Sequence, residues 1–211
     1  TVTDGDLDTD TAPVSVDLGG NLSFLDDGPS VGAGTASTDS IVLKTDDTEA
    51  KGGTDANAFG ATATDSGALA AALLAGAVGT VSYGADGQGA APTIGAFSLN
   101  VDTANSGLTS GGDTVYLVKL ANGSVVGSTV SVADDVDASN TVFTVSVSGT
   151  GDVTLTQTGA LDQATTTSHD EAVTLGNGKL SLSATVTVTD GDLDTDTAPV
   201  SVDLGGNLSF L

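Results

Sequence analysis

The chain contains no cysteine, no methionine, no tryptophan and no arginine. Without cysteine it can form no disulfide bond and offers no thiol for catalysis or for a zinc site. The absence of methionine leads us to expect a segment of a longer chain, so the lack of a signal peptide carries no information. Neither absence fixes the cellular compartment.

Basic residues are scarce: four lysines face 28 acidic residues, and the formal net charge is −24. Such a polyanion is repelled by phosphate backbones and by anionic lipid, so we expect no nucleic-acid partner. The most apolar stretch, residues 68–78, is too short to cross a bilayer, so we expect no direct membrane insertion. All acidic residues except Glu49 and Glu171 are Asp, the shorter side chain, which suits turns and hard cations.

Aromatic residues make up only 3% of the chain, whereas Gly, Val, Thr and Ser are abundant. This mixture favours short strands joined by tight turns. We therefore predict an all-β fold, an Ig-like antiparallel β-sandwich with one short helix in an insertion. The helix is expected over residues 69–75, capped by Asp65 or Ser66, and residues 84–92 are expected to form a glycine-rich loop. Alternating apolar positions predict strands at residues 14–18, 22–24, 41–44, 78–83, 97–101, 115–118, 125–132, 142–147, 153–156, 172–175 and 179–189.

Residues 1–25 return letter for letter as residues 187–211. A repeat of this length and identity indicates a tandem array whose unit is the size of a domain. We predict that residues 26–211 form one β-sandwich module and that residues 1–25 are a copy of the module's end. That first copy is expected to act as a linker, to pack on the module's N-terminal end, or to pair with a neighbouring molecule.

Each copy carries the acidic motif DGDLDTD, with Asp4, Asp6 and Asp8 in the first and Asp190, Asp192 and Asp194 in the second. In a flat strand such carboxylates lie about 6.7 Å apart, whereas calcium–oxygen distances are about 2.4 Å. Either the chain curls at the glycine, or an ion takes two or three carboxylates and completes its shell elsewhere. Asp26, Asp27 and backbone carbonyls are candidates for that completion, and we expect Asp26 and Asp27 to bridge successive modules.

The alternative to a metal site is a solvated acidic face, because two exposed charges this far apart repel by only about 0.6 kcal/mol in water. The choice of Asp over Glu, the glycine and the position at a module end favour Ca²⁺. A second candidate is the acidic loop of Asp134, Asp135 and Asp137, for which a solvated loop is the simpler interpretation.

Catalysis is not expected. His169 is the only histidine, no G-x-S-x-G nucleophile motif is present, and there is no cysteine. We interpret His169 as a turn residue and predict that the chain is not an enzyme.

The run GDTVYLVKLANGSVVGSTV, the later runs FTVSVSGTGDVTLTQTGALDQ and LSLSATVTVTDGDLDTDTAPVSVDLGGNLSFL, and the sequence DDGP that follows the first copy resemble the long repeats of RTX adhesins. These are giant type I-secreted surface proteins of Gram-negative bacteria. The resemblance covers residues 97–211 and 26–29 well, and residues 30–96 more loosely. It implies an extracellular β-sandwich extender at the cell surface, rigidified by calcium, that spaces an adhesive tip from the cell and serves in adhesion and biofilms.

The sequence therefore leaves two functions open. The first is a structural extender whose partners are neighbouring repeats of the same chain, with the adhesive target bound elsewhere in the full protein. The alternative is a calcium-dependent adhesin module that binds a glycan or a peptide. The near-absence of aromatic platforms and the identity of the repeated segments favour the extender.

Overall fold

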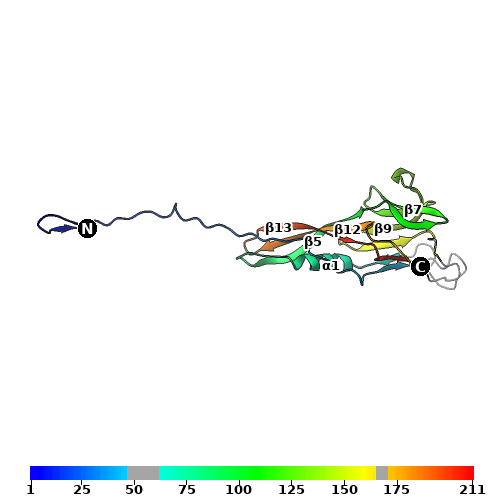
Figure 1. Cartoon of the computed structure of the whole chain (residues 1–211), viewed down its shortest axis with the longest axis horizontal. Helices are drawn as coiled ribbons and strands as arrows, with labels where there is room; N and C mark the ends of the chain where they lie inside the picture. The colour runs from blue at the N-terminus through cyan, green and yellow to red at the C-terminus, as the bar shows by residue number, and fades with distance from the viewer. Residues whose placement is uncertain (47–61, 165–170) are drawn as a thin grey trace.

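A computed structural model describes residues 1–46, 62–164 and 171–211. It consists of an elongated body, residues 26–211, and an extended segment, residues 1–25, which we call the tail (Figure 1). The tail joins one end of the body, and the C-terminus lies near the other end. His169 lies outside the described residues, so its predicted place in a turn remains a prediction.

The largest sheet is antiparallel and has the strand order β4-β10-β9-β8-β7-β6. Its inward side chains alternate with outward ones, as the period of a strand requires. Its members are β4 (Thr62–Thr64), β6 (Asn105–Ser110), β7 (Asp113–Lys119), β8 (Val125–Ser128), β9 (Thr141–Val147) and β10 (Val153–Gln157).

Two three-stranded sheets complete the body. In the first, β12 (Leu180–Asp190) lies between β5 (Gln88–Val101) and β13 (Thr195–Asp203), antiparallel to both. In the second, β14 (Leu208–Phe210) lies between β11 (Val173–Thr174) and β3 (Leu43–Thr45), and its pairing with β3 is parallel. The all-β sandwich with one short helix that the sequence predicts is confirmed.

The core lies between these sheets. Strand β12 buries Leu180, Leu182, Ala184, Val186 and Val188 on a single face, in the alternation that its sequence predicts. Phe143 of β9 packs on Phe210 of β14 with ring centroids 4.8 Å apart, which joins the six-stranded sheet to the sheet of β14. These aromatic rings are the largest fully buried side chains of a core otherwise built from aliphatic residues.

The predicted helix is confirmed and runs slightly longer than expected, as α1 (Ala68–Val78). Its capping carboxylate comes from Asp65, which accepts hydrogen bonds from the amides of Leu69 and Gly67. The same carboxylate accepts the amide of Val153 in β10, so the helix start is tied to the sheet. No helix among the described residues has the length and apolar character needed to span a membrane.

Two sequence predictions between α1 and β5 are wrong. Residues 78–83 form no strand, because the helix continues to Val78 and only Ser82 makes an isolated bridge, to Ser30. Residues 84–92 were expected to form a glycine-rich loop, yet β5 begins at Gln88. At Gly89 a side chain would collide with the backbone of Asp190, so this glycine permits close strand pairing.

The two identical segments adopt different structures. Residues 187–211 complete β12 and form β13 and β14. In the tail, β1 (Val2–Thr3) and β2 (Thr9–Asp10) form a small hairpin, and residues 11–25 contain no strand. The strands predicted at residues 14–18 and 22–24 are therefore wrong for the tail, because no described part of the chain covers their apolar side chains there.

Candidate metal centre

The second copy of the acidic motif forms a tight turn between β12 and β13, which we call the acidic turn (residues 190–194). The amide of Asp190 donates to the carbonyl of Asp194 at 3.1 Å, and the amide of Asp194 donates to Oδ1 of Asp190 at 2.9 Å. Leu193 takes a φ of 81°, a left-handed conformation that is rare for a residue with a Cβ. The chain therefore curls at the motif, one of the two arrangements that the sequence left open.

The tail builds the same turn without support from the body. The amide of Asp4 donates to the carbonyl of Asp8, the amide of Asp8 donates to Oδ1 of Asp4, and Leu7 has a φ of 76°. All tail residues around it are exposed. The turn is thus encoded locally, and differences between the two copies arise from what surrounds each.

In the body, the acidic turn meets two further carboxylates. Carboxylate oxygens of Asp26, Asp192 and Asp194 lie within 4.8 Å of one another, and so do those of Asp86, Asp190 and Asp192. The two groups share Asp192, and we call these five residues the acidic cluster. The distance fits a cation lying between the oxygens, since two calcium–oxygen bonds of about 2.4 Å together span about 4.8 Å.

Asp190 is the residue of the cluster that most strongly indicates a cation site. Its side chain is fully buried, and its Oδ1 accepts the Asp194 amide. Its Oδ2 is buried and has no hydrogen-bond partner among the residues that the structure describes. A buried carboxylate oxygen left without a donor or a cation is costly, so this atom is suited to ligate a metal ion.

The electrostatics of the cluster point the same way. The pKa of Asp192 is raised, first by a side-chain interaction with Asp190 that favours the protonated form, then by desolvation and by the charges of Asp190 and Asp26. The pKa of Asp194 is raised by a similar interaction with Asp26 and by the charges of Asp192, Asp26 and Asp86. Because these carboxylates lie close together, their negative charges favour a bound proton. A metal cation can take the place of that proton and neutralise the same charges.

The tail copy provides the comparison. There Asp4, the counterpart of Asp190, has a lowered pKa, first through its side-chain interaction with Asp6 and further through backbone amides, with desolvation acting against them. The tail has the turn but neither Asp26 nor Asp86 beside it. At the body's copy, the charges of Asp26 and Asp86 therefore add to the interactions among the carboxylates of the motif itself.

Two contacts hold Asp26 beside the turn. Oδ2 of Asp196 accepts the amide of Val31 at 2.9 Å, and Ser30 forms a two-way backbone bridge with Ser82. Asp196 belongs to the same motif but serves here to position the segment that carries Asp26. Asp27 lies close by, packed against Gly84, where a side chain would collide with its backbone.

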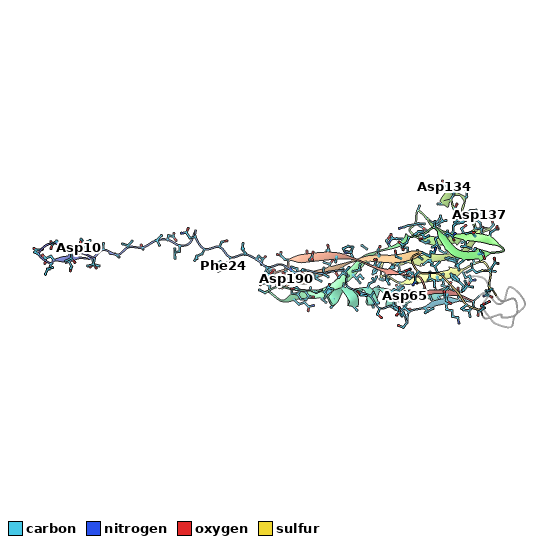
Figure 2. All side chains as sticks on the ribbon, in the orientation of Figure 1. Asp10, Phe24, Asp65, Asp134, Asp137 and Asp190 are labelled. Carbon is cyan, nitrogen blue, oxygen red and sulfur yellow. The ribbon has the colours of Figure 1, made fainter. Side chains whose placement is uncertain are left out.

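Of the residues that the sequence proposed as ligands, the fold brings together Asp26, Asp190, Asp192 and Asp194. Asp27 is adjacent to the cluster but belongs to neither group of three. Asp4, Asp6 and Asp8 lie at the far end of the tail, fully separated from the body, as the position of Asp10 in Figure 2 shows. Asp26 lies beside the acidic turn of its own body, and the role of Asp26 and Asp27 in bridging successive modules remains a prediction.

The second acidic loop is not assembled in this way. Asp134, Asp135 and Asp137 are exposed, at the opposite end of the body from Asp190 (Figure 2). The carboxylate of Asp137 accepts the hydroxyl and amide of Ser139, which lower its pKa. Within the described part of the chain these three do not form a group of close carboxylates, so the simpler interpretation as a solvated loop fits better.

Asp86 is the cluster residue that the sequence analysis missed. It precedes Gly87, which has a φ of 73°, in the loop before β5. Its carboxylate reaches the cluster because β5 pairs with β12 up to Gln88 and Asp190. That Asp–Gly step is a turn signal, but only knowledge of the strand register would place it next to the acidic turn.

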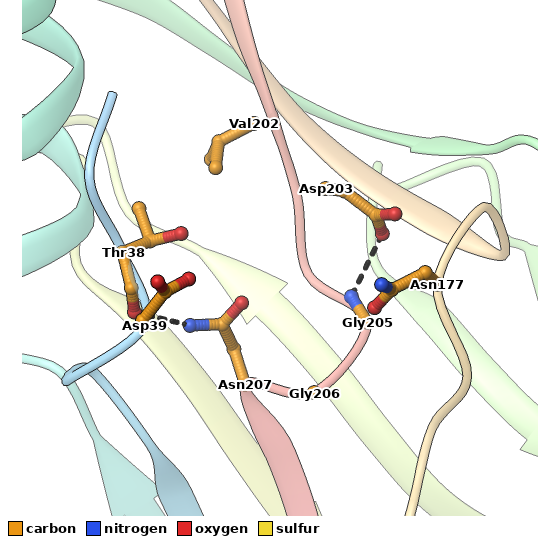
Figure 3. Close-up of a pocket in the computed structure, with 8 residues that line it drawn as sticks. All are labelled: Thr38, Asp39, Asn177, Val202, Asp203, Gly205, Gly206 and Asn207. Atoms are coloured by element: carbon orange, nitrogen blue, oxygen red, sulfur yellow. Dashed lines mark hydrogen bonds between the residues drawn. The ribbon is translucent and has the colours of Figure 1, made fainter. Parts of the chain in front are cut away.

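A polar pocket lies where the turn between β13 and β14 meets residues 38 and 39 (Figure 3). The carboxylate of Asp203 accepts the backbone amides of Gly205 and Gly178, and the side-chain amide of Asn207 donates to the carbonyls of Thr38 and Ile41. Its principal polar groups are thus engaged in holding the chain in place. Its lining contains no aromatic residue, so it lacks the usual platform for a sugar ring.

Residues 42–205 match the family described as "Domain of unknown function (DUF5801)". The match includes Asp86 and the acidic turn, and it leaves out Asp26 and the tail. No curated protein and no solved structure matches the chain significantly.

Proposed function

Since the chain belongs to the DUF5801 family, whose description assigns no activity, we propose a function from its own residues: a calcium-rigidified extender module of a bacterial surface adhesin. The observation that carries the proposal is the position of the acidic cluster. Asp26, one of its members, directly follows the tail, and the other four come from the end of the body where the tail joins.

A cation in the cluster would fix the point at which the preceding segment leaves the body. Asp26 is held on the body by its neighbours Ser30 and Val31, and a metal bond to Asp192 and Asp194 would add a rigid contact one residue from the tail. The junction between modules would then change from a flexible linker to a defined joint. Such a joint is what a spacer needs to hold a distant tip away from a cell.

The shape of the body supports a spacer. The tail joins one end of its long axis and the C-terminus lies near the other, so successive units would follow one another lengthwise (Figure 1). The partners would be neighbouring repeats of the same chain, with adhesion carried by another part of the full protein. Among the described residues, the polar pocket is lined by no aromatic side chain, which gives no support to the ligand-binding alternative.

Calcium is the cation that we propose, because five carboxylates of short side chains offer oxygen ligands in an irregular, partly solvent-facing arrangement. Magnesium requires nearly ideal octahedral geometry at about 2.0–2.1 Å, whereas calcium accepts flexible shells at about 2.3–2.6 Å. Extracellular calcium sites typically bind at about 0.1–1 mM. The module would therefore be loose inside a bacterium, where free calcium is low, and firm at the extracellular surface where we place it.

The test is calcium binding measured by calorimetry, together with thermal unfolding in calcium, in magnesium and in chelator at constant ionic strength. The chain supplies a matched pair of variants with the same substitution in the same local sequence. Asp190→Asn should abolish calcium binding and the calcium-dependent rise in melting temperature, whereas Asp4→Asn should change neither. Coincident unfolding curves of the unmodified chain with and without calcium would refute the proposal.

A further inference from the structure

The tail and the C-terminal residues combine identical sequences with opposite surroundings. Phe24 is 93% exposed and its counterpart Phe210 is 1% exposed; Val14 is 95% exposed and Val200 is 2%. Leu22, Leu25 and Leu18 are likewise exposed, whereas Leu208, Leu211 and Leu204 are buried. The apolar side chains of residues 9–25 thus lack, in this chain, the cover that the same side chains have in residues 195–211.

The contacts of residues 195–211 show which surface of the body covers these apolar side chains. Strand β13 pairs with β12 along its whole length, from Thr195 to Asp203. Strand β14 is bordered on both sides, by β11 and by β3, and Phe210 packs on Phe143. All these partners belong to residues 26–194, so a segment with the sequence of residues 195–211 would find every one of these contacts again.

The tail cannot reach this surface on its own body. Leu25 is bonded to Asp26, whose carboxylate lies within 4.8 Å of those of Asp192 and Asp194. The place of Leu25 on that surface is the position of Leu211, beyond the far end of β13. The nine residues of β13 alone span about 30 Å at about 3.3 Å per residue, so one peptide bond cannot bridge the distance.

We propose that the tail is a docking segment for the body of a second copy of this chain, in which residues 9–25 of one molecule replace residues 195–211 of the next. The arrangement reproduces the order of the tandem sequence, because Leu25 in the position of Leu211 is followed by Asp26. The interface is head-to-tail and open, so exchange produces linear oligomers. This inference does not depend on calcium or on the adhesin function.

The unmodified chain gains no contact by the exchange, because the incoming and outgoing segments are identical. The covalently attached copy keeps the advantage of high local concentration, so oligomers form slowly and mainly at high protein concentration. A substitution that damages only the attached copy removes that advantage. The neighbour's tail, which is still intact, then fits better than the chain's own C-terminal residues.

The test is Phe210→Asp compared with Phe24→Asp. Phe210→Asp places a charge in the core, so the chain should assemble head-to-tail, and its mass in light scattering should rise with concentration to several multiples of 20.3 kDa. Phe24→Asp should remain monomeric with an unchanged melting temperature. The double variant should be unstable and should not assemble.

A peptide of residues 187–211 provides a second measurement. Added to Phe210→Asp, it should bind one to one, shorten the oligomers and raise the melting temperature. The proposal is overturned if Phe210→Asp stays monomeric whether folded or not. It is equally overturned if the double variant forms the same oligomers, since these would then arise without the tail's apolar residues.

Discussion

Asp26 and Asp194 lie with carboxylate oxygens within 4.8 Å of each other, although they belong to opposite ends of the sequence. The pair joins the first residue of the body to the acidic turn, at the end where the tail joins. Without a cation the two carboxylate charges repel each other, and Asp26 raises the pKa of Asp194. The stability of this end therefore depends on the ions present in solution.

The substitution Asp190→Asn should have opposite effects with and without calcium. In chelator it removes a buried charge while keeping an oxygen for the Asp194 amide, so the variant should be at least as stable as the unmodified chain. In calcium it removes a ligand, so the variant should lose the stabilisation of about 2.7 kcal/mol that a site gives at a hundredfold excess of calcium. Urea unfolding in both buffers measures the difference, and a variant that is less stable in both would contradict the metal interpretation.

Lowering the pH should stabilise the calcium-free cluster. The folded-state pKa values of Asp192 and Asp194 are raised, so the folded chain binds protons more tightly than the unfolded chain. By linkage, their contribution is present below the usual aspartate pKa of about 3.9 and is lost as the pH rises through the raised values.

The control for this effect is Asp192→Asn, because Asp137 and Asp152 have lowered pKa values and act in the opposite direction. In calcium-free buffer the difference in melting temperature between the unmodified chain and Asp192→Asn should shrink as the pH falls. A difference independent of pH would mean that Asp192 is not crowded by its neighbours.

Matched alanine substitutions in the two copies of the repeat should change the free energy of unfolding by different amounts. Leu208 is fully buried, so Leu208→Ala should cost about 2–5 kcal/mol, the usual range for a large core residue. Leu22→Ala changes the same residue of the repeat where it is 64% exposed and should leave the free energy of unfolding unchanged. Urea unfolding measures both, and an equal loss in the two variants would show that the tail packs against a body.

Gly127→Ala should be destabilising by about 1–3 kcal/mol, because a Cβ there would collide with the ring of Phe143 on the neighbouring strand. That ring cannot move freely, since it also packs on Phe210. Gly149→Ala is the control, because no atom of the described residues lies within 4 Å of a Cβ at that position. Similar melting temperatures for the two variants would contradict the tight packing of β8 on β9.

The sequence identified what depends on local pattern. The alternation of Leu180, Leu182, Ala184, Val186 and Val188 predicted β12 because one face of that strand is buried along its whole length. The acidic turn could also be predicted from the sequence, because it forms in both copies whatever surrounds it.

What the sequence missed depends on register and on distant partners. Asp86 becomes a cluster residue only through the pairing of β5 with β12. Gly89 looks like a loop residue in the sequence, yet it permits the close approach of Asp190 within that pairing. Residues 14–18 have the alternation of a strand, yet they form none, because alternation describes a preference that a partner surface must satisfy.

The parallel pairing of β14 with β3 has a mechanical consequence. A pull between Asp26 and Leu211 enters β3 from its N-terminal side and β14 from its C-terminal side. The three register pairs from Leu208–Leu43 to Phe210–Thr45 are then loaded in shear, along the strands, so their hydrogen bonds must break together rather than one after another. In a chain of such units under tension, each body would therefore resist unfolding at the pairing of β14 with β3.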